Sequence, residues 1–164
     1  MVIKFADNSE NFIGDKPQLV MYVNKITNVA DRTQKSVINL ELVSKEYILN
    51  EKIRVTQRFD GKISDHVQKI LTDQKYLKTE KPVTVEDTIN EYNFFGNNKK
   101  SFYTVTWLSK KAVSSEHQKL GQSAGFFFYE TYDGFFFKSI DGLLSQEPKL
   151  KLIYNETPDT SGAN

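Results

Sequence analysis

The chain contains no cysteine, and this absence excludes several kinds of chemistry. Its 164 residues offer no thiol to form a disulfide, bind zinc or act as a nucleophile. This is compatible with synthesis in a reducing cytoplasm. No run of about 18 consecutive apolar residues occurs, and residues 1–7 lack the apolar core of a signal peptide. We therefore expect neither secretion nor membrane insertion.

An excess of charge of one sign is also missing. The 22 Lys and Arg residues nearly balance the 21 Asp and Glu residues, which leaves a formal net charge of +1 at pH 7. Dedicated nucleic-acid-binding proteins usually carry a clear basic excess, because they neutralise phosphates. The 8 Gly residues are scattered, so no glycine-rich phosphate loop is present. We expect no specific nucleic acid as a partner, and the pair Lys99-Lys100 is predicted to lie in a solvated turn.

Metal-binding and nucleophile motifs are absent as well. His66 and His117 are the only histidines, and they lack the His-x-x-x-His spacing of a helical metal site. We expect both to be exposed near helix ends. No Gly-x-Ser-x-Gly motif, which would position a serine nucleophile, occurs. We therefore expect no catalytic residue, no metal site, no cofactor and no enzymatic activity.

Pairs of neighbouring carboxylates leave one catalytic alternative open. Glu46 with Glu51, or Glu86 with Asp87, could supply the acid and the nucleophile of a glycosidase. Such a chain would be a peptidoglycan-degrading tail domain. Because nothing in the sequence brings an acid and a nucleophile together, solvated loop charges are the preferred interpretation.

Aromatic residues, in contrast, are abundant, and they concentrate in one segment. Aromatic side chains make up 13% of the chain, a surplus that favours large buried cores or interfaces. Residues 124–140 read as two aromatic strands around Asp133-Gly134, a dipeptide that tolerates the positive φ angles of a type I′ turn. A two-residue turn at this point would pair Tyr132 with Phe135. The segment therefore predicts a β-hairpin.

Both faces of this hairpin are predicted to be aromatic. One face would carry Phe126, Phe128, Glu130, Tyr132, Phe135 and Phe137. The other would carry Phe127, Tyr129, Thr131, Phe136 and Lys138. A surface hairpin normally alternates apolar with polar residues, so we expect one face to be covered by helices of the chain and the other by a partner. Phe127, Tyr129, Phe136 and Lys138 are thus the candidate interface residues. The alternative is a surface that stacks the bases of single-stranded nucleic acid.

Two helices are predicted between the strands of the chain. The first covers about residues 64–73, with Ser64 as its N-cap and one apolar face. That face consists of Ile63, Val67, Ile70 and Leu71, and it leaves His66, Gln68, Lys69 and Asp73 outside. The second runs from an N-cap at Ser101 to about residue 114, with Phe102, Val105, Leu108 and Ala112 on its buried face beside Trp107.

Strands are predicted over residues 19–23 and 36–43, with turn residues at 28–32 between them, and again over 53–59. The first two should pair antiparallel. Residues 1–17 read as a polar lead-in, and 114–123 as a polar loop. Residues 76–100 read as a polar connection held by Val83, Val85 and Ile89, ending in a turn at residues 93–98.

The order of these elements resembles a known family. It consists of residues 39–47, a helix opened by residues 63–67, a helix bearing Trp107-Leu108 with residues 109–112, the hairpin sequences 126–130 and 133–135, and a closing segment at 139–141. This order is similar to the baseplate central hub protein of T-even-like contractile-tailed phages. Late-control tail proteins and type VI secretion spike proteins are related to it. The resemblance covers about residues 19–150.

The resemblance implies a structural, non-enzymatic role. It predicts a homotrimeric hub that joins the tail tube to a central spike protein, with other tail tube or baseplate proteins as further partners. The location would be the baseplate of the virion tail, and the host cytoplasm during assembly. Members of the family carry a second tube domain after the matched region, so the resemblance implies a fragment or one half of a split gene.

We therefore expect an α+β protein in three parts. Residues 1–59 would form an antiparallel β-barrel-like portion of a tube domain. Residues 60–154 would form an inserted α+β domain of two helices and the aromatic hairpin. Residues 155–164, which are small and polar, would form a disordered tail.

Overall fold

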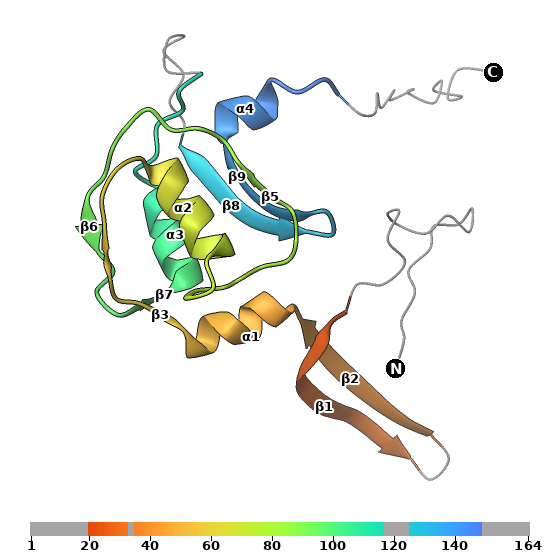
Figure 1. The fold of residues 1–164 in the computed structure, drawn as a ribbon. Helices are drawn as coiled ribbons and strands as arrows, with labels where there is room; N and C mark the ends of the chain where they lie inside the picture. Colours follow the sequence, from red (N-terminus) through yellow and green to blue (C-terminus); the bar gives the residue numbers. More distant parts are fainter. Residues whose placement is uncertain (1–19, 33–34, 117–124, 149–164) are drawn as a thin grey trace, which may run out of the picture.

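A computed structural model describes residues 20–32, 35–116 and 125–148 of the chain. It is a mixed α+β structure, as predicted. Figure 1 shows a body in which two helices lie against a small sheet, and a long β-hairpin that projects from it. The predicted lead-in, most of the predicted polar loop and the predicted tail lie outside the described residues.

The projecting hairpin, which we call the arm, consists of β1 (Tyr22–Arg32) and β2 (Lys35–Val43). The two strands pair antiparallel, which confirms the predicted pairing. The prediction of a turn at residues 28–32 is wrong, because these residues continue β1 opposite the start of β2. The pairing shifts register between Asn28 and Ala30, as at a β-bulge, and then continues to the end of β1.

Helix α1 (Lys45–Lys52) connects the arm to the body, and the sequence pattern did not predict it. Ser44 is its N-cap, and the Ser44 hydroxyl accepts a hydrogen bond from the backbone N–H of Tyr47 at 3.3 Å. Next come two short strands, β3 (Arg54–Val55) and β4 (Arg58–Phe59), where a single strand over 53–59 was predicted. They separate because they have different partners, β7 (Lys99–Lys100) and β6 (Phe94–Phe95).

The body is built on a three-stranded sheet in the order β5-β9-β8. Its strands are β5 (Val83–Val85), β8 (Phe126–Thr131) and β9 (Gly134–Ser139). The central strand β9 pairs antiparallel with β8 and parallel with β5. Among the described residues this is the largest sheet, and none of the sheets closes into a barrel.

Helices α2 (Ile63–Thr72) and α3 (Ser101–Ser109) bury their apolar faces against this sheet, and the short helix α4 (Ile140–Leu144) follows β9. The predicted apolar face of α2 is confirmed, since Ile63, Val67, Ile70 and Leu71 are all fully buried. Helix α3 ends five residues earlier than predicted. The segment after its end is bound by the Asn90 amide, which donates to the carbonyl of Lys111 at 2.8 Å and accepts from the N–H of Val113 at 3.0 Å.

Neither predicted serine caps its helix. The N-caps by position are Lys62 and Lys100, and neither provides a side-chain cap. The free N–H groups are instead satisfied from distant segments. The Thr88 hydroxyl accepts from the N–H of Ser64 at 3.0 Å, and the Asn50 amide oxygen accepts from the N–H of Phe102 at 2.8 Å.

The aromatic hairpin is present, but its register differs from the predicted one by two residues. Thr131 pairs with Gly134 and Phe128 with Phe137, so Tyr132 and Asp133 occupy the turn. Neither of these turn residues has a positive φ angle, which rules out a type I′ turn, whereas Gly134 has φ 134°. Because side chains alternate with a period of two, a shift of two residues leaves every paired side chain on the face predicted for it.

Residues 76–100 are held by both apolar and polar side chains, and the predicted anchors Val83 and Val85 are confirmed because they pack partly buried against the core. Ile89 is 49% exposed, whereas Thr88 is fully buried. Glu86 accepts from the hydroxyl of Ser114 at 2.6 Å and from the N–H of Ser139 at 2.8 Å. The turn predicted over residues 93–98 is confirmed only at its end, because Phe94–Phe95 form β6. Asn97 and Asn98 have φ 42° and 56°, and the N–H of Lys99 donates to the carbonyl of Gly96.

Candidate interaction surfaces

The arm has one apolar face, which follows from its register. Residues directly opposite each other in an antiparallel pair point to the same side. Val23 is opposite Leu42, and Ile26 is opposite Leu40. Since Ile38 precedes Leu40 by two positions, it lies on this side as well. We call this set of five, Val23, Ile26, Ile38, Leu40 and Leu42, the arm face.

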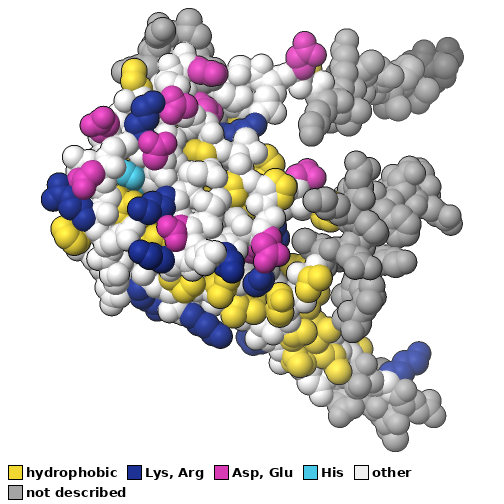
Figure 2. Space-filling model, viewed as in Figure 1, with side chains coloured by type: hydrophobic (Ala, Val, Ile, Leu, Met, Phe, Trp, Pro, Cys, Tyr) yellow, Lys and Arg dark blue, Asp and Glu magenta, His cyan; other side chains and the backbone are white. Residues whose placement is uncertain are grey.

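Among the residues that the structure describes, little covers the arm face. Val23, Ile26 and Ile38 are 51%, 66% and 56% exposed. Figure 2 shows hydrophobic side chains gathered over the arm and its junction with the body, at the lower right of the molecule. The arm is also a sheet of only two strands, so among the described strands both of its outer edges are unpaired. A two-stranded hairpin with an open apolar face is marginally stable in water.

The opposite side of the arm has a more polar character. Lys25 is opposite Glu41, and Thr27 is opposite Asn39. Val37 also lies on this side and is 55% exposed. The arm is therefore amphipathic, as a sheet is when one face is meant to be covered and the other meets water.

A second open surface lies on the aromatic hairpin, where the sequence placed the candidate interface. One side of the hairpin is in the core, because Phe126, Phe135 and Phe137 are at most 6% exposed. On the other side Phe127 is 54% exposed. We call the four candidate residues on that side, Phe127, Tyr129, Phe136 and Lys138, the outer hairpin face.

The outer hairpin face is ordered by contacts between its own side chains. The rings of Tyr129 and Phe136 stack with centroids 5.3 Å apart and an interplanar angle of 11°. The ammonium of Lys138 lies 5.8 Å from the centroid of Phe136, within the range of a cation–π contact. The structure thus brings the four predicted residues together on one side, and their role as an interface stays a prediction.

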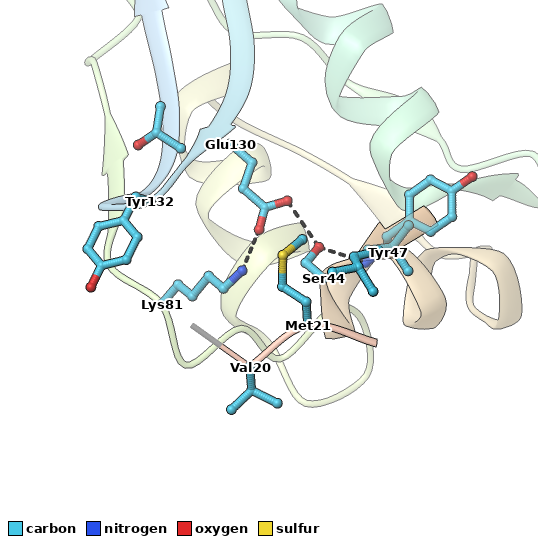
Figure 3. Close-up of a pocket in the computed structure, with 10 residues that line it drawn as sticks. Val20, Met21, Ser44, Tyr47, Lys81, Glu130 and Tyr132 are labelled. Carbon is cyan, nitrogen blue, oxygen red and sulfur yellow. Dashed lines mark hydrogen bonds and ion pairs between the residues drawn. The ribbon is translucent and has the colours of Figure 1, made fainter. Parts of the chain in front are cut away.

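A groove lies between the base of the arm and the body, and we call it the base groove. Its volume is about 420 Å³. Its walls include Leu42 and Val43 from the arm, and Val20 and Met21 from the segment that leads into β1. Ser44 and Tyr47 at the start of α1 and, from the body, Lys81 and residues 130–132 complete them. Figure 3 shows the Lys81 ammonium directed at Glu130, with Ser44 on the other side of the same carboxylate.

The polar groups at this groove form a connected network. Lys81 forms ion pairs with Glu130 and, at 3.4 Å, with Glu46. The Ser44 hydroxyl donates to Glu130 at 3.0 Å, and the Thr79 hydroxyl donates to Glu46 at 2.7 Å. Because Glu46 belongs to α1 and Glu130 to β8, the network joins the base of the arm to the sheet of the body.

The carboxylate pairs that could have served a glycosidase are each used in other contacts. Glu46 is buried beside Lys81, whereas Glu51 pairs with Lys100 on the surface. The hydrogen bond from Lys100, aided by the positive charges of Lys100 and Arg54, lowers the pKa of Glu51. Asp87 accepts hydrogen bonds from the ammonium of Lys62 at 3.2 Å and the hydroxyl of Ser64 at 3.2 Å. These contacts join neighbouring segments of the fold.

His66 does not lie exposed, and that prediction is wrong. His66 is 3% exposed, because its ring packs against those of Phe59 and Phe94. The ring centroids of Phe59 and Phe94 lie 5.4 and 5.6 Å from that of the imidazole in T-shaped contacts, and the two phenyl rings stack 5.0 Å apart. The His66 Nε2–H donates to the carbonyl of Tyr92 at 3.0 Å. Burial lowers the pKa of His66, and the hydrogen bond to Tyr92 opposes this effect. His117 lies outside the described residues.

No family model, curated protein or solved structure matches this chain. Within the described part of the chain, no helix is long and apolar enough to cross a membrane.

Sequence reasoning missed the arm face and the base groove. The arm face does have a signal in the sequence, since Ile38, Leu40 and Leu42 alternate with Asn39 and Glu41. The alternation predicts one apolar side but does not show whether anything covers it. The base groove has no local signal, because its walls come from four separate segments.

Proposed function

We propose that this chain is a structural component of a phage tail baseplate hub, which assembles with copies of itself and joins the tail tube to a central spike protein. The observation that carries the proposal is the arm: an amphipathic two-stranded sheet whose apolar face and both edges are open within the described chain. A second support is the order of elements that resembles the hub family. The protein would then act in the baseplate of the virion tail after assembly in the host cytoplasm.

The arm suggests how such an assembly would form. Strands of a neighbouring chain can continue the ladder of β1 or β2, because an open strand edge presents unpaired N–H and carbonyl groups. Repetition of this addition around an axis would produce the barrel-like wall of a tube domain. The arm face would turn toward the interior of that wall.

Burial of the arm face would contribute favourably to the free energy of association. Full burial of an aliphatic side chain contributes about 1.5–3 kcal/mol, and three residues of the arm face are more than half exposed. Covering those three would contribute roughly 3–5 kcal/mol for each copy. Part of that gain is offset by the entropy lost on association.

Light scattering coupled to size exclusion tests the proposal, with three chains as the expected mass. Ile26→Asp places a charge in the arm face and should abolish association. Val37→Asp is the matched control, since Val37 is similarly exposed on the opposite side of the arm. The proposal is wrong if the unaltered chain is monomeric at every concentration, or if the Ile26 and Val37 variants associate equally well.

A further inference from the structure

A second groove, with a volume of about 190 Å³, lies between β6 and α3. Its described walls include four aromatic residues, together with one amide and one ammonium: Phe94, Phe95, Tyr103, Trp107, Asn97 and Lys99. Phe95 and Tyr103 are 59% and 56% exposed, so two large rings beside this groove meet solvent. Pockets for whole small molecules are usually larger, at about 300–1,000 Å³, so the groove suits a single flat group.

The aromatic residues of α3 belong to a stripe that begins and ends with lysine. Lys99, Tyr103, Trp107 and Lys111 follow one another at intervals of four residues, a spacing that places side chains on one face of a helix. The Lys99 ammonium lies 5.6 Å from the ring centroid of Tyr103, and the Lys111 ammonium lies 5.2 Å from that of Trp107. We call these four residues, together with Phe95, the α3 patch.

The positive charge of the α3 patch is not neutralised by the described part of the chain. None of the described residues that line the groove is a carboxylate. Lys99 and Lys111 form no ion pair with a described residue, whereas the neighbouring Lys100 pairs with Glu51. The net charge of +1 for the whole chain therefore conceals a local positive surface, which complements an anionic ligand.

The ring of Trp107 is held in place by its neighbours. Its centroid lies 5.4 Å from that of Tyr92 and 5.3 Å from that of Phe94, both in T-shaped contacts. A ring that is already fixed loses little conformational entropy when a ligand stacks on it. Since every nucleobase has a flat π-face, such rings bind unpaired bases of any sequence.

We propose that the α3 patch binds single-stranded nucleic acid without sequence preference. Bases stack on Phe95, Tyr103 and Trp107, and phosphates meet Lys99 and Lys111. Exposed rings interleaved with lysines are typical of single-strand-binding surfaces, whereas lysine is depleted at protein–protein interfaces. The bases of a duplex are already paired and stacked on one another, so they are not free to stack on these rings. The inference goes beyond the proposed function and does not depend on it, because the α3 patch and the arm have no residue in common.

Fluorescence measures binding at this surface directly, since Trp107 is the only tryptophan of the chain. An oligothymidylate of about 12 nucleotides, within the usual range of site sizes, should quench Trp107 and give a dissociation constant. Tyr103→Ala should raise that constant about 5-fold or more, because one stacked base is lost. Tyr103→Phe is the matched control: it keeps the ring and should change the constant by less than about 2-fold.

The two lysines are tested by the salt dependence of the same titration. Each phosphate contact to a single strand contributes about −0.7 to the slope of log affinity against log salt concentration. Lys99→Gln and Lys111→Gln should therefore each make the slope shallower by about 0.7. Lys69→Gln is the control and should leave the slope unchanged. Lys69 also lies over a ring, 5.5 Å from the centroid of Phe59, but Phe59 is 3% exposed and cannot stack on a base.

The proposal is overturned if the oligothymidylate does not quench Trp107 at low salt, or if the same strand annealed to its complement binds equally well. Equal weakening by Tyr103→Ala and Tyr103→Phe would also overturn it. Equally tight binding of poly-L-glutamate would assign the α3 patch to an acidic protein segment and remove the nucleic acid. The hub proposal is tested separately by the association of the Ile26→Asp variant, so failure of either proposal leaves the other standing.

Discussion

Gly134 lies directly against Pro82, with no room between them for a side chain. A Cβ added at position 134 would be 2.1 Å from the carbonyl oxygen of Pro82, which accepts the N–H of Phe135 at 2.9 Å. This close approach is where β5 joins the hairpin in parallel pairing. The glycine therefore serves the junction of two strands as well as the turn.

Gly134→Ala is expected to destabilise the protein strongly. The added methyl collides with backbone, and position 134 also has φ 134°, where a side chain is strained. We expect a loss of about 3 kcal/mol or more in the free energy of unfolding, measured by urea titration. Gly61→Ala is the control, since Gly61 has φ 114° but no atom within 4 Å of an added Cβ. If both variants lost the same amount, the contact with Pro82 would carry no part of the effect.

The distant caps of α2 and α3 make a second prediction. Asn50→Ala removes the acceptor for the N–H of Phe102, and a lost cap typically costs about 1–2 kcal/mol. Ser101→Ala should be neutral or slightly stabilising, because the buried Ser101 hydroxyl has no hydrogen-bond partner within the described chain. Thermal unfolding of the two variants distinguishes them. A larger loss for Ser101→Ala would restore the local serine as the cap.

The buried ion pair at the base of the arm makes a third. Lys81→Met removes the cation beside Glu46, whose side chain is 5% exposed, so an unpaired carboxylate remains buried. We expect a loss of about 2–4 kcal/mol in the free energy of unfolding. Lys45→Met is the control: its ion pair with Glu80 is exposed at 53% and 81%, and such pairs contribute about 0–1 kcal/mol. Similar losses in both variants would argue against a special role of Lys81.

His66 gives the protein a predictable dependence on pH. Burial lowers the pKa of His66 from its ordinary value of 6.5, so below about pH 6.5 the unfolded chain binds a proton that the folded protein does not. Stability should therefore fall as the pH is lowered through 6.5, and this loss should end once the pH is below the lowered pKa. Urea midpoints between about pH 7.5 and 5.5 measure it, above the range where most carboxylates titrate. His66→Gln should flatten the profile, and an unchanged slope would assign the dependence to other groups.

Sequence periodicity predicted the features that one element determines alone. The buried face of α2 follows from the spacing of Ile63, Val67, Ile70 and Leu71, and the two faces of the hairpin follow from a period of two. The error of two residues in register did no harm to the faces for the same reason. The antiparallel pairing of residues 36–43 with the preceding strand could also be predicted from the sequence.

The features that sequence could not supply all depend on a second, distant segment. Thr88 and Asn50 replace the local serines as caps because the fold brings them to the helix ends. His66 is buried because Phe59 and Phe94 come from β4 and β6, on either side of it in sequence. Likewise, the parallel pairing of β5 with β9 joins residues about fifty positions apart, and the sequence of Val83–Val85 alone does not indicate its partner strand.

The outer hairpin face makes the last prediction, which separates an interface from a core. Phe127 is 54% exposed whereas Phe135 is 1% exposed, although both belong to the same hairpin. Phe127→Ser should therefore change the free energy of unfolding by less than about 1 kcal/mol, and Phe135→Ser should cost about 3–5 kcal/mol. If the outer hairpin face contacts a partner, Phe127→Ser and Phe136→Ser should weaken association more than they weaken folding. Equal losses of stability in the Phe127 and Phe135 variants would mean that both faces of the hairpin are core. The outer hairpin face would then not be available to a partner.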